Sequence, residues 1–206
     1  SKDNPENVLP ARFAGYVPTK IHVTVQCLHS YKSTHKKEEL ILNKQELFQK
    51  IKGQMIISCQ AIPGEPLYVE EKSIMYLMAR AAKMAGTPAI RTSSIRDVIA
   101  IKEETGLPVI GLVKIQYPGF DSYITPTMKE VDDLAAAGSD VIALDCTLRK
   151  RGDGRTVNEF ITEVREKYPD AILMADISTY EEGVNAWKLG MDIVGTTMSG
   201  YTDYSP

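Results

Sequence analysis

From residue 53 onward, short apolar runs alternate with longer amphipathic stretches. Six runs are rich in β-branched and other aliphatic side chains, and their apolar residues are nearly continuous instead of alternating with polar ones. This pattern is typical of parallel strands that are buried on both faces of a sheet. The runs span residues 55–60, 88–92, 108–114, 140–146, 171–177 and 192–197. The sequence therefore predicts six strands, each followed by an amphipathic helix.

Local signals mark the ends of several predicted helices. The Thr-Pro pair at 125–126 has the composition of an N-cap followed by proline at the first helical position. Threonine and glutamate stand three residues apart at 156–159 and again at 179–182, which is the spacing of a capping box. Gly and Pro within 105–108 indicate the end of a helix and the start of a strand.

The succession of strand and helix predicts the fold class. Parallel strands joined by helices form right-handed crossover units. The six runs start roughly 20 to 33 residues apart, and a (β/α)8 barrel of about 250 residues has about 30 residues per unit. A doubly wound open sheet also accommodates six strands, but residues 58–66 (SCQAIPGEP) stand where such a sheet carries a Gly-rich phosphate loop. We therefore predict a TIM (β/α)8-type barrel, of which six βα units are visible in this chain.

The chain divides into an arm and a barrel domain. Residues 1–40 are predicted to form a flexible N-terminal arm, because they are polar and poor in pattern apart from 20–28, whose alternation suits a strand. Residues 41–206 form the barrel domain. Asn43 begins a helix whose apolar side is expected to cover the bottom of the barrel with Leu47, Phe48 and Ile51.

Composition and charge narrow the class of partners. Of the 206 residues, 43% are hydrophobic and 25% are charged, and the net charge is -3. These values suit an ordinary globular protein, and the charge gives no electrostatic reason to expect nucleic acid or an anionic membrane as a partner. No run approaches the roughly 18 apolar residues that span a bilayer, and no basic region precedes an apolar one as in a secretion signal. We expect a cytoplasmic protein.

The three cysteines, Cys27, Cys59 and Cys146, match no zinc or disulfide spacing. Cys59 and Cys146 lie within apolar runs, where cysteine acts as a small buried hydrophobic side chain. This usage favours a reducing compartment, and no metal site is predicted.

Polar and charged side chains follow the apolar runs at their carboxyl ends. Those ends meet on one side of a barrel, which is where barrel enzymes carry their active sites. Isolated charges in apolar runs are expensive to bury without a partner, whereas a common polar pocket lets them satisfy one another. We therefore predict one shared active site. Its candidate residues are Ser58, Gln60, Arg91, Lys114, Asp145, Asp176, Thr196 and Thr197.

Several of these side chains also admit a purely structural role. Lys114 can neutralise Asp145 on the adjacent strand. Asp145 and Asp176 can cap the helices that follow them, and Gln60 can tie down its own loop.

Three features of the predicted loops have two interpretations each. Tyr117 is either a lid residue or an ordinary surface aromatic. The basic run 149–151 is interpreted as a solvated loop face, with attraction of a phosphate as the alternative. The segment 200–204, which contains Tyr201, is either a substrate loop or a turn.

Seven motifs occur in order between Lys44 and Pro206: IISCQA–PGEPLY, AIRTSS, VIGLVK–Y, YITPTMKEVDDL, VIALDCT, LMADIS and IVGTTMSGYT. In order and spacing they resemble the N-acylglucosamine-6-phosphate 2-epimerase family, the N-acetylmannosamine-6-phosphate epimerases of bacterial sialic acid catabolism. The resemblance implies a cytoplasmic, homodimeric TIM barrel. It also implies a small phosphosugar substrate, with interconversion of N-acetylmannosamine 6-phosphate and N-acetylglucosamine 6-phosphate without a redox cofactor.

The resemblance further implies roles for the candidate residues. Epimerisation at C2 removes a proton α to the C1 aldehyde of the open-chain sugar and returns it to the other face, which requires a base, an acid and donors for the enediolate oxygen. Lys114 matches the family's catalytic lysine, and Arg91 matches its strand-two arginine beside the developing oxyanion. Asp145 is expected to orient Lys114. Substrate-binding side chains are expected at Ser58, Gln60, Asp176, Thr196, Thr197 and Tyr201.

The sequence departs from the family pattern at three places. Ile115-Gln116 follow the catalytic lysine where the family usually has Arg or Lys, and Thr92-Ser93 follow the strand-two arginine where it prefers Ala-Asn. The family's seventh-strand glutamate and eighth-strand Gly-Gly phosphate site have no counterpart in the 206 residues. We therefore expect the last two barrel strands to be absent from this chain and its activity to be impaired.

Two alternative functions remain open. The chain is either a catalytically inactive truncated remnant, or it belongs to another phosphosugar TIM-barrel enzyme, such as a decarboxylase or a lyase. An aldolase-type lyase would use Lys114 as a Schiff-base nucleophile, so that borohydride trapping with a keto substrate would add mass at this residue.

Overall fold

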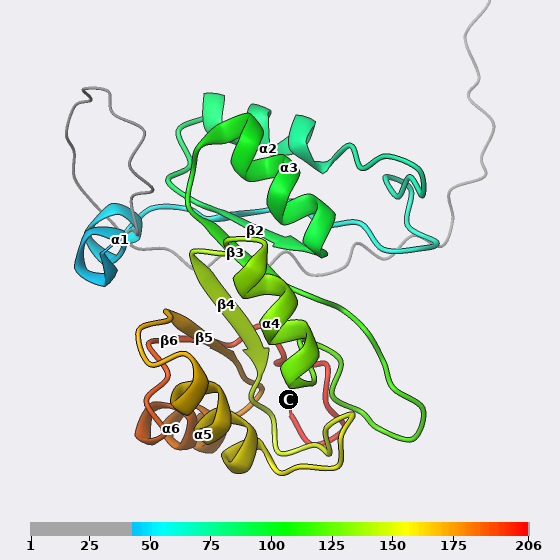
Figure 1. The fold of residues 1–206 in the computed structure, drawn as a ribbon, viewed down its shortest axis with the longest axis vertical. Coiled ribbons are helices and arrows are strands. Elements are labelled where there is room, and N and C mark those ends of the chain that lie inside the picture. The colour runs from blue at the N-terminus through cyan, green and yellow to red at the C-terminus, as the bar shows by residue number, and fades with distance from the viewer. Residues whose placement is uncertain (1–42, 206) are drawn as a thin grey trace, which may run out of the picture.

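The computed structural model describes residues 43–205, which contain six helices and six strands (Figure 1). The strands are β1 (Ile57–Ser58), β2 (Ile90–Ser93), β3 (Val109–Leu112), β4 (Val141–Asp145), β5 (Leu173–Asp176) and β6 (Ile193–Gly195). The helices are α1 (Lys44–Ile51), α2 (Met75–Met84), α3 (Ile95–Thr105), α4 (Met128–Ala136), α5 (Val157–Lys167) and α6 (Tyr180–Lys188). Each predicted apolar run contains one strand. The predicted arm 1–40 and the strand expected at 20–28 lie outside the described residues.

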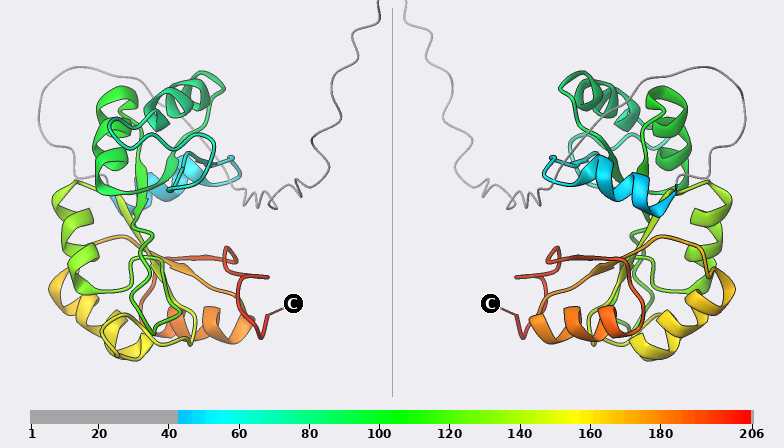
Figure 2. Two further views of the ribbon diagram at one scale, coloured as in Figure 1. Left: turned by 90° about the vertical axis from the view of Figure 1, so that its right-hand side faces the viewer. Right: turned by 90° about the vertical axis from the view of Figure 1, so that its left-hand side faces the viewer.

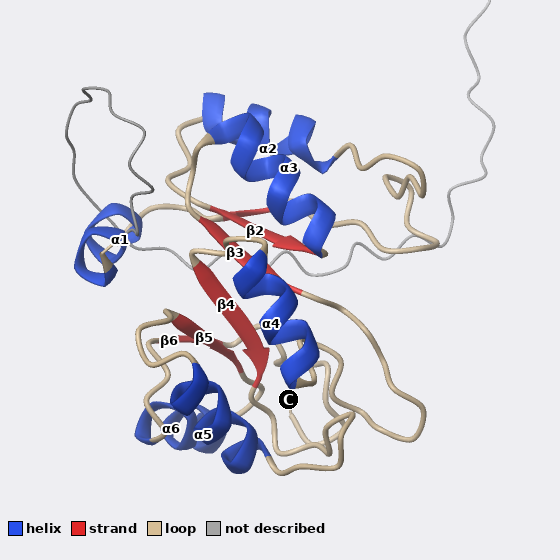
Figure 3. Ribbon diagram, in the orientation of Figure 1, coloured by secondary structure: helices blue, strands red, loops and turns tan. Residues whose placement is uncertain are grey.

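All six strands lie in one parallel sheet, in the order β1-β2-β3-β4-β5-β6. A doubly wound sheet would begin in its middle and then reverse direction, so that alternative is wrong. Figure 2 shows the sheet curving with helices along its outside, and Figure 3 shows strand and helix alternating along the chain. The predicted TIM-type barrel with six βα units is confirmed. Among the described residues, β1 and β6 are the open edges of the sheet.

Apolar side chains pack on both faces of the sheet. An outer cluster between the strands and the helices includes Ile90 and Leu144, and an inner cluster within the curve of the sheet includes Ile110 and Met174. Successive residues of a strand point to opposite faces, so continuous apolar runs supply both clusters at once. Every residue of β3, β4 and β5 is buried, as the runs predicted.

Helix α1 covers the end of the inner cluster that faces the starts of the strands. The side chain of Asn43 caps the helix, and Lys44 forms an ion pair with Asp192, which directly precedes β6. The apolar residues of α1 that join or pack against the inner cluster are Leu47, Phe48 and Ile51. The prediction that this helix covers the bottom of the barrel is confirmed.

The capping boxes predicted at 156–159 and 179–182 are present at the starts of α5 and α6. In each box the threonine hydroxyl and the glutamate carboxylate satisfy backbone N–H groups that a helix leaves unpaired at its first turn. Gly106 ends α3 with a φ of 61°, a left-handed conformation that glycine adopts without a steric penalty.

The helix start predicted at 125–126 is wrong. Helix α4 begins two residues later, with Thr127 as the N-cap of a further capping box. Thr125 has a φ of 47° and its hydroxyl accepts a hydrogen bond from the N–H of Val113 at 3.2 Å. This residue is tied to the end of β3, so it is not available to cap α4.

The two described cysteines, Cys59 and Cys146, are fully buried, as predicted for small hydrophobic side chains. Burial raises the pKa of the Cys59 thiol to about 11 and also raises the pKa of Cys146. Both thiols therefore stay protonated at neutral pH and are poor nucleophiles.

An apolar groove, the β6-edge groove, lies beside the open edge of β6. Trp187 on α6 is 69% exposed, and Val194 on β6 is 41% exposed. The groove has a volume of about 480 Å³ and is lined chiefly by Ile177, Tyr180, Gly183, Val184, Trp187, Val194 and Thr196. Within residues 43–205, no helix has the length and apolar character needed to cross a membrane.

Candidate active site

The sheet register places most of the candidate residues at one end of the barrel. Ser58 on β1 lies opposite Arg91 on β2, and Asp145 on β4 lies opposite Asp176 on β5. Asp176 in turn lies opposite Gly195 on β6. Because all strands are parallel, these residues share the carboxyl-terminal edge of the sheet, where barrel enzymes carry their chemistry.

An ion pair between Arg91 and Asp176 crosses the barrel interior. The guanidinium donates two hydrogen bonds to the carboxylate, at 2.9 and 2.8 Å. The two strands that carry these side chains are not neighbours in the sheet. Asp176 is fully buried and also accepts a hydrogen bond from the hydroxyl of Thr197 at 2.5 Å. The alternative that Asp176 caps the following helix is wrong, because Thr179 is the N-cap of α6.

Lys114 follows β3 at the same edge of the sheet. The residue as a whole is exposed, and its backbone N–H donates to the hydroxyl of Ser93 at 3.3 Å. Partial burial of the ammonium group lowers the pKa of Lys114. The Arg91 guanidinium lowers this pKa further, while Glu65 and Asp176 act in the opposite direction. A lysine with a lowered pKa is neutral more often near pH 7, as a general base requires.

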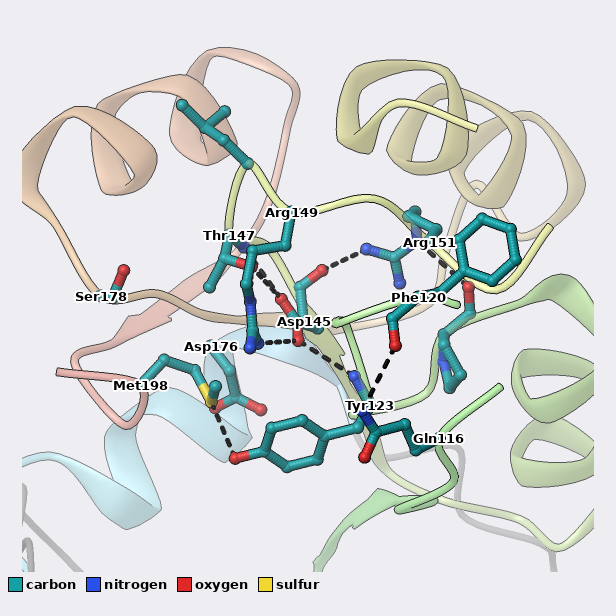
Figure 4. A network of polar contacts seen from close by, with 12 residues as sticks. Gln116, Phe120, Tyr123, Asp145, Thr147, Arg149, Arg151, Asp176, Ser178 and Met198 are labelled. Atoms are coloured by element: carbon teal, nitrogen blue, oxygen red, sulfur yellow. Dashed lines mark hydrogen bonds and ion pairs between the residues drawn. The ribbon is translucent and has the colours of Figure 1, made fainter. Parts of the chain in front are cut away.

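Asp145 is fully buried, and its carboxylate is held by three neighbours on the loops (Figure 4). One oxygen accepts from the N–H and hydroxyl of Thr147, at 3.1 and 2.6 Å. The other accepts from Arg149 at 2.8 Å and from the N–H of Tyr123 at 3.3 Å. The expectations that Asp145 neutralises Lys114, orients it or caps a helix are therefore wrong. Asp145 instead fixes the two loops around the end of β4.

The basic run 149–151, expected to be a solvated loop face, is exposed only at Lys150, while both arginines turn inward. The Arg149 side chain is 14% exposed and its guanidinium lies 5.6 Å from the ring centroid of Tyr123. Arg151 is fully buried and donates to the backbone carbonyls of Thr125, Pro126 and Asp145. No local signal in the sequence indicates that these arginines turn inward. The acceptors of Arg151, for example, lie as many as 26 residues earlier in the chain.

Gln60 and Ser58 lie together at the end of β1. The amide of Gln60 donates to the Ser58 hydroxyl at 2.7 Å. The Gln60 side-chain oxygen is buried and has no hydrogen-bond partner among residues 43–205. A buried acceptor without a partner is costly, and a bound ligand with an amide or hydroxyl group can satisfy it. This geometry suits the expected substrate-binding role of both residues.

The structure separates the two threonines that follow β6. Thr197 bonds Asp176 and so faces the barrel interior, whereas Thr196 lines the β6-edge groove on the outer side. The two side chains therefore lie on opposite sides of the sheet. Thr196 therefore does not join the other candidate residues. Tyr201 is 45% exposed, on the tail that follows.

Within residues 43–205, no group of three or more His, Cys, Asp and Glu side chains is arranged to hold a metal ion. The site as described consists of a lysine, a cross-barrel arginine–aspartate pair and several neutral hydrogen-bonding groups.

The charges around Lys114 predict that two substitutions shift the pKa of Lys114 in opposite directions. Arg91→Met removes a positive neighbour, so the pKa of Lys114 should rise toward its ordinary value of 10.5. Asp176→Asn removes a negative neighbour and should lower the pKa further. The pH dependence of Lys114 modification by an amine-reactive reagent, read by mass spectrometry, measures both shifts. Shifts of the same sign in the two variants would contradict this electrostatic account.

Comparison of the sequence with known proteins identifies relatives of this chain. A family model described as "Putative N-acetylmannosamine-6-phosphate epimerase" matches residues 75–206. A relative from Caldanaerobacter subterraneus that carries the corresponding 2-epimerase name is 50% identical over 161 residues, which are 78% of this chain and 67% of the relative. A relative from Borrelia garinii with the same name is 49% identical over 156 residues, or 76% of this chain and 66% of the relative.

A solved structure gives the same result. The N-acetylmannosamine-6-phosphate 2-epimerase from Clostridium perfringens superposes with a TM-score of 0.71 at 44% identity, covering 85% of this chain and 72% of that one. This chain thus spans about two thirds of the length of the curated relatives it matches. On this similarity in sequence and fold, the chain belongs to the N-acetylmannosamine-6-phosphate epimerase family.

Proposed function

We propose that this protein interconverts N-acetylmannosamine 6-phosphate and N-acetylglucosamine 6-phosphate by moving a proton at C2 of the sugar. The observation that carries the proposal is Lys114, a lysine with a lowered pKa at the active edge of the barrel, close to Arg91. Family membership supports it, since the relatives carry the name N-acetylmannosamine-6-phosphate 2-epimerase.

In the proposed reaction the neutral amine of Lys114 removes the C2 proton of the open-chain sugar. This proton is acidic because it lies α to the C1 aldehyde, and the electron pair that is released moves onto O1. Arg91 stabilises the resulting negative charge, for which it must share its guanidinium between Asp176 and the enediolate oxygen. Gln60 and Asp176 hold the hydroxyl groups and the N-acetyl group.

Completing the epimerisation requires a proton donor on the opposite face of C2. We assign no residue between 43 and 205 to this role. We therefore expect this chain to exchange the C2 proton with solvent faster than it forms the second epimer.

Proton exchange tests the proposal directly. The purified chain is incubated with N-acetylmannosamine 6-phosphate in D2O, and the C2 proton is followed by NMR. Loss of the signal supports Lys114 as the base. Simultaneous appearance of N-acetylglucosamine 6-phosphate would mean that a complete acid–base pair is present. A persistent C2 signal would overturn the proposal for this chain and favour the inactive remnant.

A lysine with a lowered pKa also suits a Schiff base, the chemistry of an aldolase-type lyase. Borohydride trapping separates the two functions, because a covalent adduct at Lys114 with a keto sugar phosphate is expected only for the lyase. A decarboxylase would instead release carbon dioxide from a sugar acid phosphate, so a separate incubation with such a substrate, followed by NMR for its loss, tests that function.

A cytoplasmic location follows from the proposed substrate. A phosphate monoester carries about 1.5 to 2 negative charges at pH 7, and such an ion does not enter the apolar interior of a bilayer unaided. The enzyme therefore works where the sugar phosphate is made.

We further propose that the chain forms a homodimer through the β6-edge groove. The groove carries exposed Tyr180, Trp187 and Val194, and apolar surfaces of this kind tend to associate.

The only tryptophan of the 206 residues, Trp187, reports on this interface. Its fluorescence should shift to longer wavelength on dilution, as the dimer dissociates and the indole becomes hydrated. Val194→Lys should give the shifted spectrum at every concentration. Met84→Lys, on the 84%-exposed residue at the end of α2, should behave as the unmodified chain. A spectrum independent of concentration in a chain that remains monomeric by light scattering would refute the dimer.

A further inference from the structure

The loop between β3 and α4 begins at Lys114 and returns beside it. Lys114 pairs with Ile124 in an antiparallel bridge. The N–H of Ile115 donates to the carbonyl of Tyr123 at 3.0 Å, and the N–H of Thr125 donates to the carbonyl of Val113 at 2.7 Å. The outgoing arm of this loop, residues 114–117, and its returning arm, residues 122–125, therefore pair at the base of the loop. The base carries Lys114. The backbone position of Lys114 depends on what holds these two arms.

The returning arm is anchored through its backbone. The N–H of Ser122 donates to the carbonyl of Lys150 at 3.3 Å, and the N–H of Tyr123 donates to Asp145 at 3.3 Å. Figure 4 shows this arm meeting the Asp145 network. Both acceptors belong to the end of β4 and the loop after it, so the returning arm is fixed independently of Lys114.

The outgoing arm is anchored by the side chain of Tyr117. Its hydroxyl donates to Glu130 at 2.8 Å, and Glu130 is the 3%-exposed carboxylate of the α4 capping box. The hydrogen bond to Glu130 also raises the pKa of the Tyr117 phenol, so the hydroxyl remains a donor at neutral pH. The ring rests on the backbone of Gly152, where a Cβ atom would overlap it.

We propose that Tyr117 is a positioning residue for Lys114. By joining the outgoing arm to α4 and to the β4–α5 loop, it holds the lysine at the mouth of the barrel, where its ammonium group is partly desolvated. The inference rests on the proposed role of Lys114 as the base. It settles the two interpretations of Tyr117, lid residue or surface aromatic, in favour of a fixed anchor.

The chain contains a matched control for this contact. Tyr204, on the tail after β6, donates to Glu182 at 2.7 Å. Glu182 occupies the same position in the α6 capping box that Glu130 occupies in α4. Tyr204→Phe therefore removes the same kind of hydrogen bond without touching the loop of Lys114.

The first test measures Lys114 itself and needs no enzymatic activity. In Tyr117→Phe the modification rate of Lys114 by an amine-reactive reagent at pH 8 should fall about three- to tenfold, because rehydration of the ammonium group raises its pKa and lowers the fraction of neutral amine. The charged groups that act on this ammonium, Glu65, Arg91 and Asp176, are unchanged by the substitution. Tyr204→Phe should leave the rate unchanged.

A second variant separates positioning from loss of the hydrogen bond. Gly152→Ala keeps the Tyr117 hydroxyl but displaces its ring, and the φ of Gly152 is not in the positive range, so alanine fits the backbone. It should reproduce the fall seen in Tyr117→Phe. Equal effects of Tyr117→Phe and Tyr204→Phe on Lys114, or no effect of either loop variant, would overturn the inference.

Proton exchange then links the contact to the reaction. In Tyr117→Phe the maximal rate of C2 exchange should fall about three- to tenfold, in step with the fraction of neutral Lys114, while KM changes little. If the unmodified chain shows no C2 exchange, the proposed function fails, and the reactivity of Lys114 in the variants still decides the role of Tyr117.

Discussion

Replacing Lys114 with methionine should reduce C2 proton exchange by about 100- to 10,000-fold, the range that general acid–base groups contribute. Methionine keeps the length and the apolar stem of the side chain and removes only the amine that accepts the proton. The measurement is the initial rate of C2 signal loss in D2O, compared with that of the unmodified chain at equal protein concentration.

The control for this substitution is Lys188→Met. Lys188 is exposed in the last turn of α6, away from the strand ends, so its removal should leave exchange unchanged. Thermal stability should also be unchanged in Lys114→Met, because Lys114 is exposed. Exchange that persists in a folded Lys114→Met protein would show that another group is the base.

Replacing Arg151 with methionine should lower the free energy of unfolding by about 3 to 5 kcal/mol, because it leaves three buried carbonyls unpaired and each costs about 1 to 3 kcal/mol. Its guanidinium donates to three backbone carbonyls, and its Cζ atom lies 3.8 Å from the ring centroid of Phe160. Methionine fills similar volume but leaves the carbonyls unpaired. Urea unfolding followed by circular dichroism gives the difference.

Two further variants sharpen this experiment. Arg151→Lys should recover only part of the loss, because an ammonium group cannot reproduce the planar fork that reaches three acceptors. Arg155→Met, four residues later and in an exposed ion pair with Glu163, should change stability by less than about 1 kcal/mol. A loss for Arg151→Met no larger than that of Arg155→Met would contradict the role of Arg151 as a clamp between loops.

Local sequence was sufficient for the elements of the fold. Continuous apolar runs predict buried parallel strands, because both faces of such a strand must be apolar, and each run contains a strand. The capping boxes at 156–159 and 179–182 were equally predictable, since a threonine and a glutamate three residues apart satisfy the first turn of a helix within that turn. The barrel topology followed from repetition of one unit.

Local sequence was not sufficient for the partners of polar groups. Thr125 has the local pattern of a helix cap, yet it is tied to Val113 on the preceding strand. Asp145 has the position of a catalytic or capping aspartate, yet it is held by Thr147, Arg149 and a backbone N–H. For each of these acceptors the sequence offers several donors, and only the packing of the loops selects among them.

The sequence by itself determined where strands and helices lie, which faces they bury, and that Ser58, Arg91, Lys114 and Asp176 come to one edge of the sheet. Each of these depends on residues within one turn or one strand, or on the shared direction of parallel strands. Only the tertiary structure decided that Arg151 is buried, that Thr196 lines the β6-edge groove and that the Tyr117 hydroxyl bonds Glu130. These depend on contacts between residues far apart in the chain, where a buried charge or hydroxyl takes the acceptor that packing brings to it.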